Sequence, residues 1–498
     1  MKKLFLILLL VPTLAWATSY TEFYVQTTGN NLNAGSTTED AANYTDTGGT
    51  WVQSTGVFTV SSGDPSANAS VTNGAWASVY PDAYVTNVFI GRVTAVDSTT
   101  ITVSLTAKAG VAPINGTTDT SIRVGGAWKG PGLGIVNDWD SQFPFLFVEN
   151  TLTNASSNFP RFNFLAATYN ITNTINQTND GPMFFSGYTS TPGDGGKWTV
   201  DGGTSIASYQ LFATLGDNNN YTDWELKNNG NSGAAYGMQI SGQENVLIRV
   251  VVHDVRNIGI SVGNLAAHTL IECEAYNCNQ GAGGGGVGGI GVSNGGNTLI
   301  RCYSHDNACA GFAATAGAVF IDCVSFNNTG GLDGFYLNVS SVTVLKGCIA
   351  YNNARDGVHQ DVSAGAALVI ENCAIFSNGG YGVANKTATT LLKNGSIYNC
   401  VFGSGTEANA SGDVDASGLP GIDVQGSITY ASNETPWVDP ANGDFNLSSG
   451  ATIKAAGLGN FTTWTTNGYV TAFPDIGAVQ AASTNTSLGG ASSHTFAQ

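Results

Sequence analysis

The residues best suited to acid–base chemistry lie around three Gly–apolar pairs, Gly334–Phe335, Gly357–Val358 and Gly382–Val383. Successive side chains of an extended strand alternate between its two faces. If the apolar residue after each Gly points inward, the second and fourth residues after the Gly face solvent. Together with charged residues just before the Gly, this alternation predicts one solvent-open patch, formed by Asp333, Tyr336, Asn338, Arg355, Asp356, His359, Asp361 and Lys386.

This patch admits two kinds of chemistry. Paired carboxylates a few ångströms apart can share a proton and support glycosidic hydrolysis. The carboxylates of Asp333, Asp356 and Asp361 could instead hold Ca²⁺ while Lys386 or Arg355 abstracts a proton. The alternative is that Asp-Gly is ordinary turn chemistry and the patch is a solvated surface. The residues expected to contact a substrate are Tyr336, Asn338 and Arg256.

Two His-Asp pairs form a second candidate group, His253-Asp254 and His305-Asp306. Both pairs occupy the same place in an internal repeat, two repeats apart, which predicts a separation of roughly 10 Å if repeats stack at strand spacing. Histidine is the natural proton carrier near neutral pH, so all four residues are candidate catalytic groups. The alternative is that each His replaces an aromatic ring in a stacked column.

The repeat that positions these residues is marked by cysteine and asparagine. The recurring cysteines are Cys273, Cys302, Cys323, Cys348, Cys373 and Cys400. Five residues after four of them come Asn307, Asn328, Asn353 and Asn378. Three residues after five of them come the rings of Tyr276, His305, Phe326, Tyr351 and Phe376. His253 fits the same place one repeat earlier, where Val250 takes the cysteine position.

A repeat of roughly 25 residues, built from short alternating runs broken by Asn and Gly, favours one turn of a β-solenoid. Like residues of successive coils then stack about 4.8 Å apart. The asparagines are expected to hydrogen-bond along an interior column, and the cysteines to fill another as reduced apolar groups. Cys278 and Cys309 fall off the column, so a disulfide between them is an alternative.

This repeat resembles the pectin-lyase-like superfamily of right-handed parallel β-helices. The start of the chain, Phe23-Tyr24-Val25 followed by Gly29–Gly35, resembles the opening of many secreted β-helix proteins, and Trp437–Leu447 with Asp475–Ala478 resembles their closing segment. The chain is also similar to uncharacterised β-helix proteins of phage and marine bacterial origin. The resemblance implies an all-β fold, a single right-handed parallel β-helix, with an inserted N-terminal β-rich module and chemistry on its outer wall.

The expected organisation begins with a signal peptide, because Met1-Lys2-Lys3, an apolar run and Ala15-Trp16-Ala17 have the pattern of a cleaved secretory leader. The expected parts are a signal peptide (1–17), an opening strand and cap (18–39), a β-rich module (40–130), the β-helix coils (131–440, most regular over 221–400), a closing segment (441–480) and a disordered tail (481–498). No stretch after the leader is apolar enough to span a membrane.

The charge limits the partners. The chain has 35 acidic and 17 basic residues, for a formal net charge of −18. Nucleic acid is an unexpected partner because phosphate binding needs clustered Lys and Arg. An acidic polysaccharide would need a local basic patch or bridging cations.

These observations predict a secreted or surface protein that binds and depolymerises a polysaccharide or cell-surface glycan along the solenoid wall, as a lyase or a glycosidase. No cofactor, or Ca²⁺, is expected, and the protein is either a monomer or a homotrimer. The alternative is a non-catalytic adhesin or a phage tail-spike-like receptor-binding protein. A purely structural surface protein would lack a cluster of titratable groups on its wall.

Overall fold

The computed structural model describes most of the chain from residue 160 onward and several segments before it. The described residues are 21–26, 43–73, 75–81, 89–109, 117–124, 128–129, 160–171, 174–177, 182–203, 210–229, 236–263, 267–279, 288–330, 332–339, 341–361, 367–385, 394–404, 408–415, 422–429, 436–448, 451, 464–465 and 468–469. The expected signal peptide, the expected disordered tail, Gly29–Gly35, Asp475–Ala478 and Lys386 lie outside them. Among the described residues, no helix is long and apolar enough to cross a membrane.

Two compact units are present and are described separately. The N-terminal unit contains a closed antiparallel barrel in the order β2-β3-β6-β5-β4-β7. Its core includes Trp51, Phe58, Val79, Ile101 and Ile122, all fully buried. The barrel strands are β2 (Tyr44–Val52), β3 (Val57–Thr59), β4 (Trp76–Pro81), β5 (Phe89–Val96), β6 (Thr100–Ala109) and β7 (Thr117–Val124), with the 3-10 helix η1 at Pro65–Ala67. Strands β1 (Thr21–Gln26) and β8 (Trp128–Lys129) pair in parallel.

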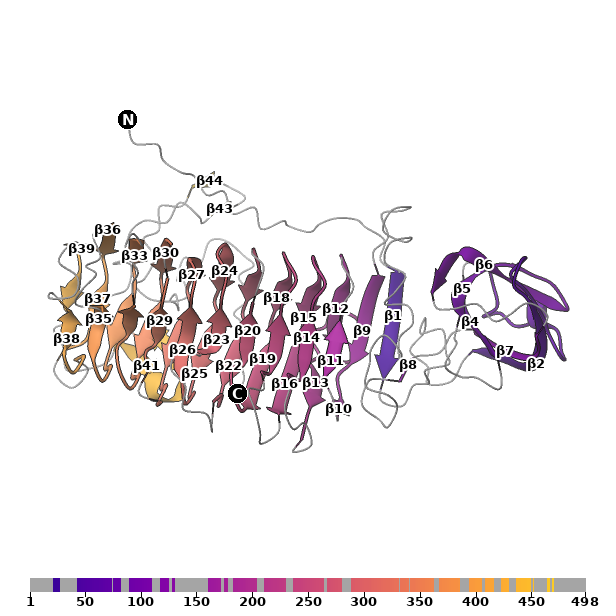
Figure 1. Cartoon of the computed structure of the whole chain (residues 1–498), viewed down its shortest axis with the longest axis horizontal. Helices are drawn as coiled ribbons and strands as arrows, with labels where there is room; N and C mark the ends of the chain where they lie inside the picture. Colours follow the sequence, from indigo (N-terminus) through magenta and orange to yellow (C-terminus); the bar gives the residue numbers. More distant parts are fainter. Residues whose placement is uncertain are drawn as a thin grey trace. The chain divides into compact units, whose positions relative to one another are not determined.

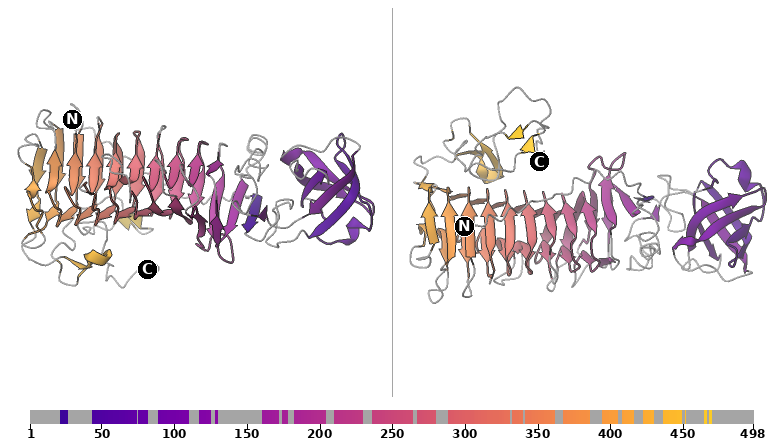
Figure 2. Two further views of the ribbon diagram at one scale, coloured as in Figure 1. Left: turned by 60° about the horizontal axis from the view of Figure 1, so that its bottom comes forward. Right: turned by 90° about the horizontal axis from the view of Figure 1, so that it is seen from above.

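The larger unit is a solenoid of short parallel strands on three sheets, drawn as successive coils in Figures 1 and 2. The first sheet includes β15 (Asn220–Thr222), β18 (Val246–Ile248), β21 (Thr269–Ile271), β24 (Asn297–Ile300), β27 (Ala318–Ile321), β30 (Thr343–Lys346), β33 (Ala367–Glu371), β36 (Asn394–Tyr398) and β39 (Ile422–Gln425). The second sheet has β10 (Thr168–Asn170), β13 (Trp198–Asp201), β16 (Trp224–Asn229), β19 (Val251–Val255), β22 (Glu274–Tyr276), β25 (Tyr303–His305), β28 (Val324–Phe326), β31 (Ile349–Tyr351), β34 (Ala374–Phe376), β37 (Val401–Phe402) and β40 (Ile428–Thr429).

The third sheet carries the predicted patch. Its strands are β11 (Ile175–Gln177), β14 (Phe212–Thr214), β17 (Met238–Ile240), β20 (Ile260–Val262), β23 (Gly288–Val292), β26 (Ala310–Ala314), β29 (Phe335–Leu337), β32 (Val358–Gln360), β35 (Tyr381–Asn385) and β38 (Gly412–Val414). The remaining elements are β9 (Pro160–Leu165), β12 (Phe184–Tyr188), β41 (Trp437–Asp439), η4 (Pro440–Asn442), β42 (Asp444–Leu447), β43 (Trp464–Thr465) and β44 (Gly468–Tyr469). The expected all-β solenoid with an N-terminal β-rich module is confirmed.

Both predicted interior columns are present. The cysteine positions are in register, because the backbone N–H that follows each cysteine donates to the cysteine carbonyl of the previous coil, for example Val324 to Cys302 at 2.9 Å. In the asparagine column each buried side-chain amide donates to the carboxamide oxygen of the next coil. These contacts run from Asn307 to Asn328 (3.0 Å), Asn328 to Asn353 (2.8 Å), Asn353 to Asn378 (2.9 Å) and Asn378 to Asn409 (2.9 Å).

Replacing Asn353 with Ala is expected to lower the free energy of unfolding by about 1–3 kcal/mol, because buried partners in two neighbouring coils lose their hydrogen bonds. The Asn353 amide also donates to the carbonyl of Ser325 at 3.2 Å. Asn442→Ala is a matched control, since Asn442 is exposed, and should change the free energy by less than about 0.5 kcal/mol. Urea denaturation measures both. Equal effects of the two substitutions would contradict the role of the column.

The corners of the coils depend on two left-handed backbone positions. One is the residue before the cysteine place, with φ between 49° and 66°. The other comes four residues after the cysteine place and is occupied by Asp254, Asn277, Asp306, Asn327, Asn352 and Ser377, with φ between 50° and 57°. Asn and Asp tolerate this conformation better than most side chains. Some of the asparagines of the repeat therefore mark the positions at which the chain turns a corner.

The alternative of a Cys278–Cys309 disulfide is not realised, because both cysteines are free and buried. Cys278 takes the asparagine place of its own coil, and its backbone N–H donates to Oδ1 of Asn307 at 2.9 Å. Cys278 lies five residues after Cys273, which is the asparagine place of the repeat, so its position outside the cysteine column does not indicate a disulfide.

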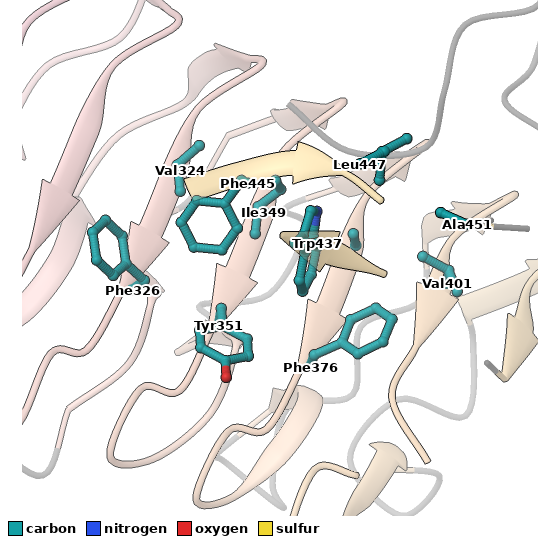
Figure 3. Packing of buried hydrophobic residues seen from close by; sticks show 11 residues of the cluster. Val324, Phe326, Ile349, Tyr351, Phe376, Val401, Trp437, Phe445, Leu447 and Ala451 are labelled. Atoms are coloured by element: carbon teal, nitrogen blue, oxygen red, sulfur yellow. The ribbon is translucent and has the colours of Figure 1, made fainter. Parts of the chain in front are cut away.

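The closing segment covers part of the outer face of the second sheet. Trp437 and Phe445, on the antiparallel strands β41 and β42, pack against the rings of Phe326, Tyr351 and Phe376, as Figure 3 shows. Ring centroids are 4.9 Å apart for Phe376–Trp437 and 5.2 Å for Phe326–Phe445. The aromatic residues of the repeat thus form a second hydrophobic core on the outside of these coils, together with the closing segment.

Candidate functional site

The predicted patch forms around β29 and β32, which pair in parallel with Tyr336 opposite His359. Phe335 and Val358 are buried, with relative exposures of 0% and 1%. This confirms that they point inward, and alternation then directs Tyr336 and His359 to the outer face.

Four side chains of the patch bind one another, and we call them the Asp–His cluster: Asp333, Arg355, Asp356 and His359. The Arg355 guanidinium donates to both carboxylate oxygens of Asp333, with Nε to Oδ1 at 2.7 Å. The His359 Nδ1 lies 2.7 Å from Oδ2 of Asp356 and 3.9 Å from Oδ1 of Asp333. The backbone N–H of Asp356 donates to Oδ1 of Asp333 at 3.1 Å. The cluster thus connects two successive coils.

The expectation that this patch is open to solvent is wrong for three of its members. Relative exposures are 0% for Asp333, 6% for Asp356 and 2% for His359. Alternation predicts only the direction in which a side chain leaves the backbone. The carboxylates of this patch instead bind donors of their own and neighbouring coils, and Asp356 also accepts from the Tyr381 N–H at 2.7 Å. Asp356→Asn should therefore cost stability, contrary to the expectation for an exposed Asp. The rim that remains accessible consists of Asn338, which is exposed, and Tyr336, Asp361 and Arg355, which are half-buried.

Two predicted roles do not fit this geometry. Arg355 is unsuited as a base because its hydrogen bonds to Asp333 raise the pKa of its guanidinium. A Ca²⁺ site built from Asp333, Asp356 and Asp361 is also disfavoured. All four carboxylate oxygens of Asp333 and Asp356 already accept from Arg355, His359 or a backbone N–H. Among the described residues, the group whose potential ligand atoms come within 4.8 Å of one another is instead Asp333, Asp356 and His359. One of these ligands is a nitrogen, whereas calcium prefers oxygen ligands.

His359 is the member of the cluster whose second ring nitrogen is not engaged by the other members, although the ring itself is buried. Since the Asp356 carboxylate accepts at Nδ1, that nitrogen carries a proton and Nε2 is the free position of the ring. Within the part of the chain that the structure describes, the buried Nε2 has no hydrogen-bond partner. An oriented imidazole with one unused nitrogen is the arrangement of a general base held by a carboxylate.

At the rim, the Tyr336 hydroxyl donates to Oδ2 of Asp361 at 3.1 Å. The Tyr336 ring stacks beside the His359 imidazole, with centroids 6.0 Å apart. Burial, followed by the charge of Asp361, raises the pKa of the Tyr336 phenol. The rim therefore offers a phenol, a carboxylate and the amide of Asn338 beside His359.

The second predicted group forms a column on the outer face of the second sheet, which we call the ring column: His253, Tyr276, His305 and Phe326. The rings stack with centroid separations of 4.5, 5.2 and 4.5 Å and interplanar angles of 3°, 8° and 14°. The alternative interpretation, in which each His replaces an aromatic ring, is therefore confirmed as a description of the packing.

Each histidine of the ring column lies between two carboxylates. His253 contacts Asp254 through Nδ1 (2.7 Å) and Glu225 through Nε2 (2.9 Å). His305 makes the same pair of contacts, with Asp306 at 2.7 Å and Glu274 at 3.0 Å. Burial lowers the pKa of both imidazoles, but the two carboxylates raise it by more, and the net shift is upward. Both nitrogens of each ring are engaged, so the column is a structural array with no free ring nitrogen.

Sequence reasoning missed both glutamates. Each glutamate lies one coil before its histidine. Glu225 is two residues before Lys227, which pairs with His253, and Glu274 is two residues before Tyr276, which pairs with His305. Each glutamate therefore points to the same face of the sheet as its histidine. The strand period of two could have identified them. Arg256, predicted to bind substrate, is half-buried and its backbone N–H donates to Oδ1 of Asn229 at 2.7 Å.

The ring column predicts a pH-dependent stability. Because the folded-state pKa of His253 and His305 is raised, their contribution is complete below the unfolded value of about 6.5 and is lost as pH rises through the folded value. The melting temperature should therefore fall as pH rises from about 6.5. The hydrogen bond from His253 lowers the pKa of Glu225 to about 2, so the contribution of Glu225 to stability is lost only as pH falls into the acid range. The other titratable groups facing the column are Asp254, Glu274, Asp306 and Tyr276, the last with a pKa raised to about 12 by burial and nearby carboxylates.

The matched control is the double variant His253→Gln/His305→Gln, which keeps polar side chains at both places but cannot titrate. Melting temperatures measured from pH 5 to 9 by differential scanning calorimetry should fall more steeply for the wild type. Parallel curves for the two proteins would contradict the assignment.

Comparisons with known proteins agree with this architecture. Residues 284–402 match a family described as right handed beta helix region, and this match with the parallel strand pairing confirms the right-handed parallel β-helix. Pectate lyase Pel9A is similar at 16% identity, over 65% of this chain and 88% of that chain, with a TM-score of 0.49. The A-module of mannuronan C-5 epimerase AlgE4 of Azotobacter vinelandii is similar at 17% identity, over 55% and 81%, with a TM-score of 0.41.

The periplasmic alginate epimerase AlgG is similar at 13% identity, over 55% of this chain and 76% of that chain, with a TM-score of 0.30. No curated protein sequence matches the chain. The assignment of the fold rests on the family match over residues 284–402 and on the parallel pairing of the strands.

Proposed function

We propose that this protein is exported, binds a polysaccharide along the outer wall of its solenoid and acts on it by acid–base chemistry. The observation that carries the proposal is the Asp356–His359 pair, whose carboxylate orients the imidazole and leaves Nε2 without a hydrogen-bond partner among the described residues. Buried polar atoms without partners are rare in proteins, which makes them candidate functional atoms. The rim of Tyr336, Asn338 and Asp361 beside it supplies hydrogen-bonding groups for a sugar chain.

Within this proposal, proton abstraction by His359 fits the geometry better than hydrolysis by two carboxylates. Glycosidases need one carboxyl as an acid and a second as a base or nucleophile. Both candidate carboxylates are occupied, Asp333 by Arg355 and Asp356 by His359. A lyase needs one base and one proton donor, and His359 with Tyr336 supplies that pair. Export is supported by the leader-like start of the sequence.

The test is a screen of the purified full-length protein against a panel of polysaccharides. Reducing ends report any cleavage, and the ultraviolet absorbance of unsaturated products reports elimination. Cleavage with unsaturated products is the expected result. Cleavage without them would support a glycosidase. Glycan binding without cleavage of any panel member would contradict the enzymatic proposal and support an adhesin or tail-spike-like receptor-binding protein.

A further inference from the structure

Six cysteines that have no part in the proposed site stack in the interior of the solenoid. We call them the cysteine column: Cys273, Cys302, Cys323, Cys348, Cys373 and Cys400. All six are free, and their relative exposures are 0% or 1%. Thiolate sulfur is a preferred ligand of soft cations, so the spacing of these six sulfur atoms decides what the column can bind.

The six side chains make the same contacts, which places their sulfur atoms in a row. Each Sγ lies 3.4–3.6 Å from the carbonyl oxygen two residues before it. From Cys302 onward, each Sγ also lies 3.5–3.8 Å from a carbonyl oxygen of the preceding coil. Equivalent atoms of paired parallel strands repeat at about 4.8 Å. Hydrogen bonds also join the Cys323 thiol to those of Cys302 and Cys348.

This spacing suits a cation that takes two sulfur ligands. Two metal–thiolate bonds of about 2.3 Å each, the length of a Zn–S bond, span about 4.6 Å. A disulfide would need Cβ atoms only about 3.5–4.5 Å apart, which is closer than the coil spacing. Zn²⁺ prefers four ligands in a tetrahedron, whereas each gap in the column offers two sulfurs. Soft cations such as Cu(I), which thiolates select, fit better.

Charge balance favours a monovalent cation, because an uncompensated charge in the interior is costly. Each bound cation displaces one thiol proton, S–H + M⁺ → S–M + H⁺, so the column stays neutral. Six sulfurs enclose five gaps, so five cations release five protons and one thiol remains protonated. Burial opposes ionisation of Cys323, but hydrogen bonds from Cys302 and Cys348 outweigh it and lower the pKa of this thiol.

The last sulfur of the column lies one coil from the end of the first sheet. In that final coil Ser427 takes the cysteine place, and its Oγ accepts from the N–H of Cys400 at 3.3 Å. Ser427 is half-buried. Val424, on the terminal strand β39, stacks on the buried Ile397 and is itself 46% exposed. A cation thus has a route to Cys400 through the final coil, and from there along the row of sulfurs.

We propose that the cysteine column binds a row of soft monovalent cations of the Cu(I) class, one between each pair of neighbouring sulfurs. The proposal is independent of the proposed function, since it uses no residue of the Asp–His cluster or its rim. Cations that bind only the folded column stabilise it by mass action, so they raise the melting temperature.

Silver(I) is the probe, because it is a soft monovalent cation that needs no reductant. The purified full-length protein is titrated in chloride-free buffer, and excess free histidine then strips silver from surface groups on a desalting column. Elemental analysis counts the retained silver, and a pH-stat counts the released protons. We expect about five silver ions and about five protons per chain, one for each gap between the six sulfurs. The circular dichroism should be unchanged and the melting temperature should rise.

Two variants of the column give different counts. Cys348→Val interrupts the row and should remove two of the five cations, whereas Cys400→Val at its end should remove one. Valine suits this place, because Val250 occupies it in an earlier coil and is fully buried. Cys309→Val is the matched control, since Cys309 is equally buried but lies outside the column, and it should retain all five.

An equal silver content in Cys348→Val and the wild type would overturn the proposal, as would a loss in Cys309→Val as large as that in Cys348→Val. Silver uptake without proton release, or uptake only after unfolding in urea, would also overturn it. If circular dichroism shows that neither column variant folds, the wild-type counts decide, because native protein that retains no silver excludes the row of cations.

Discussion

Replacing His359 with Gln is expected to lower the turnover of a cleaved glycan by about 10²- to 10⁴-fold, the range typical of losing a positioned general base. Gln keeps a side-chain donor for Asp356, whose carboxylate now accepts from Nδ1 of His359 at 2.7 Å. The substitution removes the free Nε2 and retains a side chain of similar length. KM should change less than kcat, because the rim residues that would hold the sugar are untouched. Initial rates on the substrate identified by the panel measure both constants.

His305→Gln is the matched comparison, since His305 also pairs with a carboxylate but has both ring nitrogens engaged. If His359→Gln turns over normally and His305→Gln does not, the active site lies at the ring column and the Asp–His cluster is structural. A loss confined to His359→Gln, with an unchanged melting temperature, supports His359 as the base.

Replacing Arg355 with Met is expected to lower the free energy of unfolding by about 3–5 kcal/mol, the usual cost of stripping a buried carboxylate of its partner. Asp333 has 0% side-chain exposure and would keep only the N–H of Asp356, at 3.1 Å, from its present hydrogen-bond donors. Arg301→Met is the control. Its partner Glu272 is 20% exposed and can be hydrated, so the expected loss is below about 1 kcal/mol.

The deficit of Arg355→Met should depend on pH. Burial already raises the pKa of Asp333, and hydrogen bonds from Arg355 oppose that rise. Without Arg355 the carboxyl can escape the penalty only by binding a proton, so the variant loses stability relative to the wild type as pH rises. Urea denaturation of both proteins at pH 5 and pH 8 checks this. A deficit that is no larger than that of Arg301→Met, or one that shrinks at pH 8, would contradict a buried, compensated Asp333.

The fold could be predicted from the sequence because the sequence repeats internally. Each coil repeats the same inward and outward places, so the cysteine, asparagine and ring positions could be aligned from spacing alone, and backbone register then stacks them. The same logic located Tyr336 and His359 on one outer face and placed His253 and His305 in one column. It could also have found Glu225 and Glu274, which obey the same alternation.

Burial at the corners of the coils, and the pairing that follows from it, were decided only by the tertiary structure. Alternation along a strand predicts which way a side chain leaves the backbone. Asp333, Arg355 and Asp356 lie in the turns before strands, where contacts between neighbouring coils add to those within a coil. Arg355 binds Asp333 of the preceding coil, and Asp356 binds His359 of its own coil and the Tyr381 N–H of the next. The sequence therefore predicted an open patch of acids, whereas the folded chain joins them into a compensated cluster with one unused nitrogen on His359. Likewise, the ring place is the same in every coil, yet only the folded closing segment determines that Phe326, Tyr351 and Phe376 are covered by Trp437 and Phe445. A repeat specifies which positions are equivalent between coils, whereas contacts between coils decide which side chains at those positions are buried and which atoms have hydrogen-bond partners.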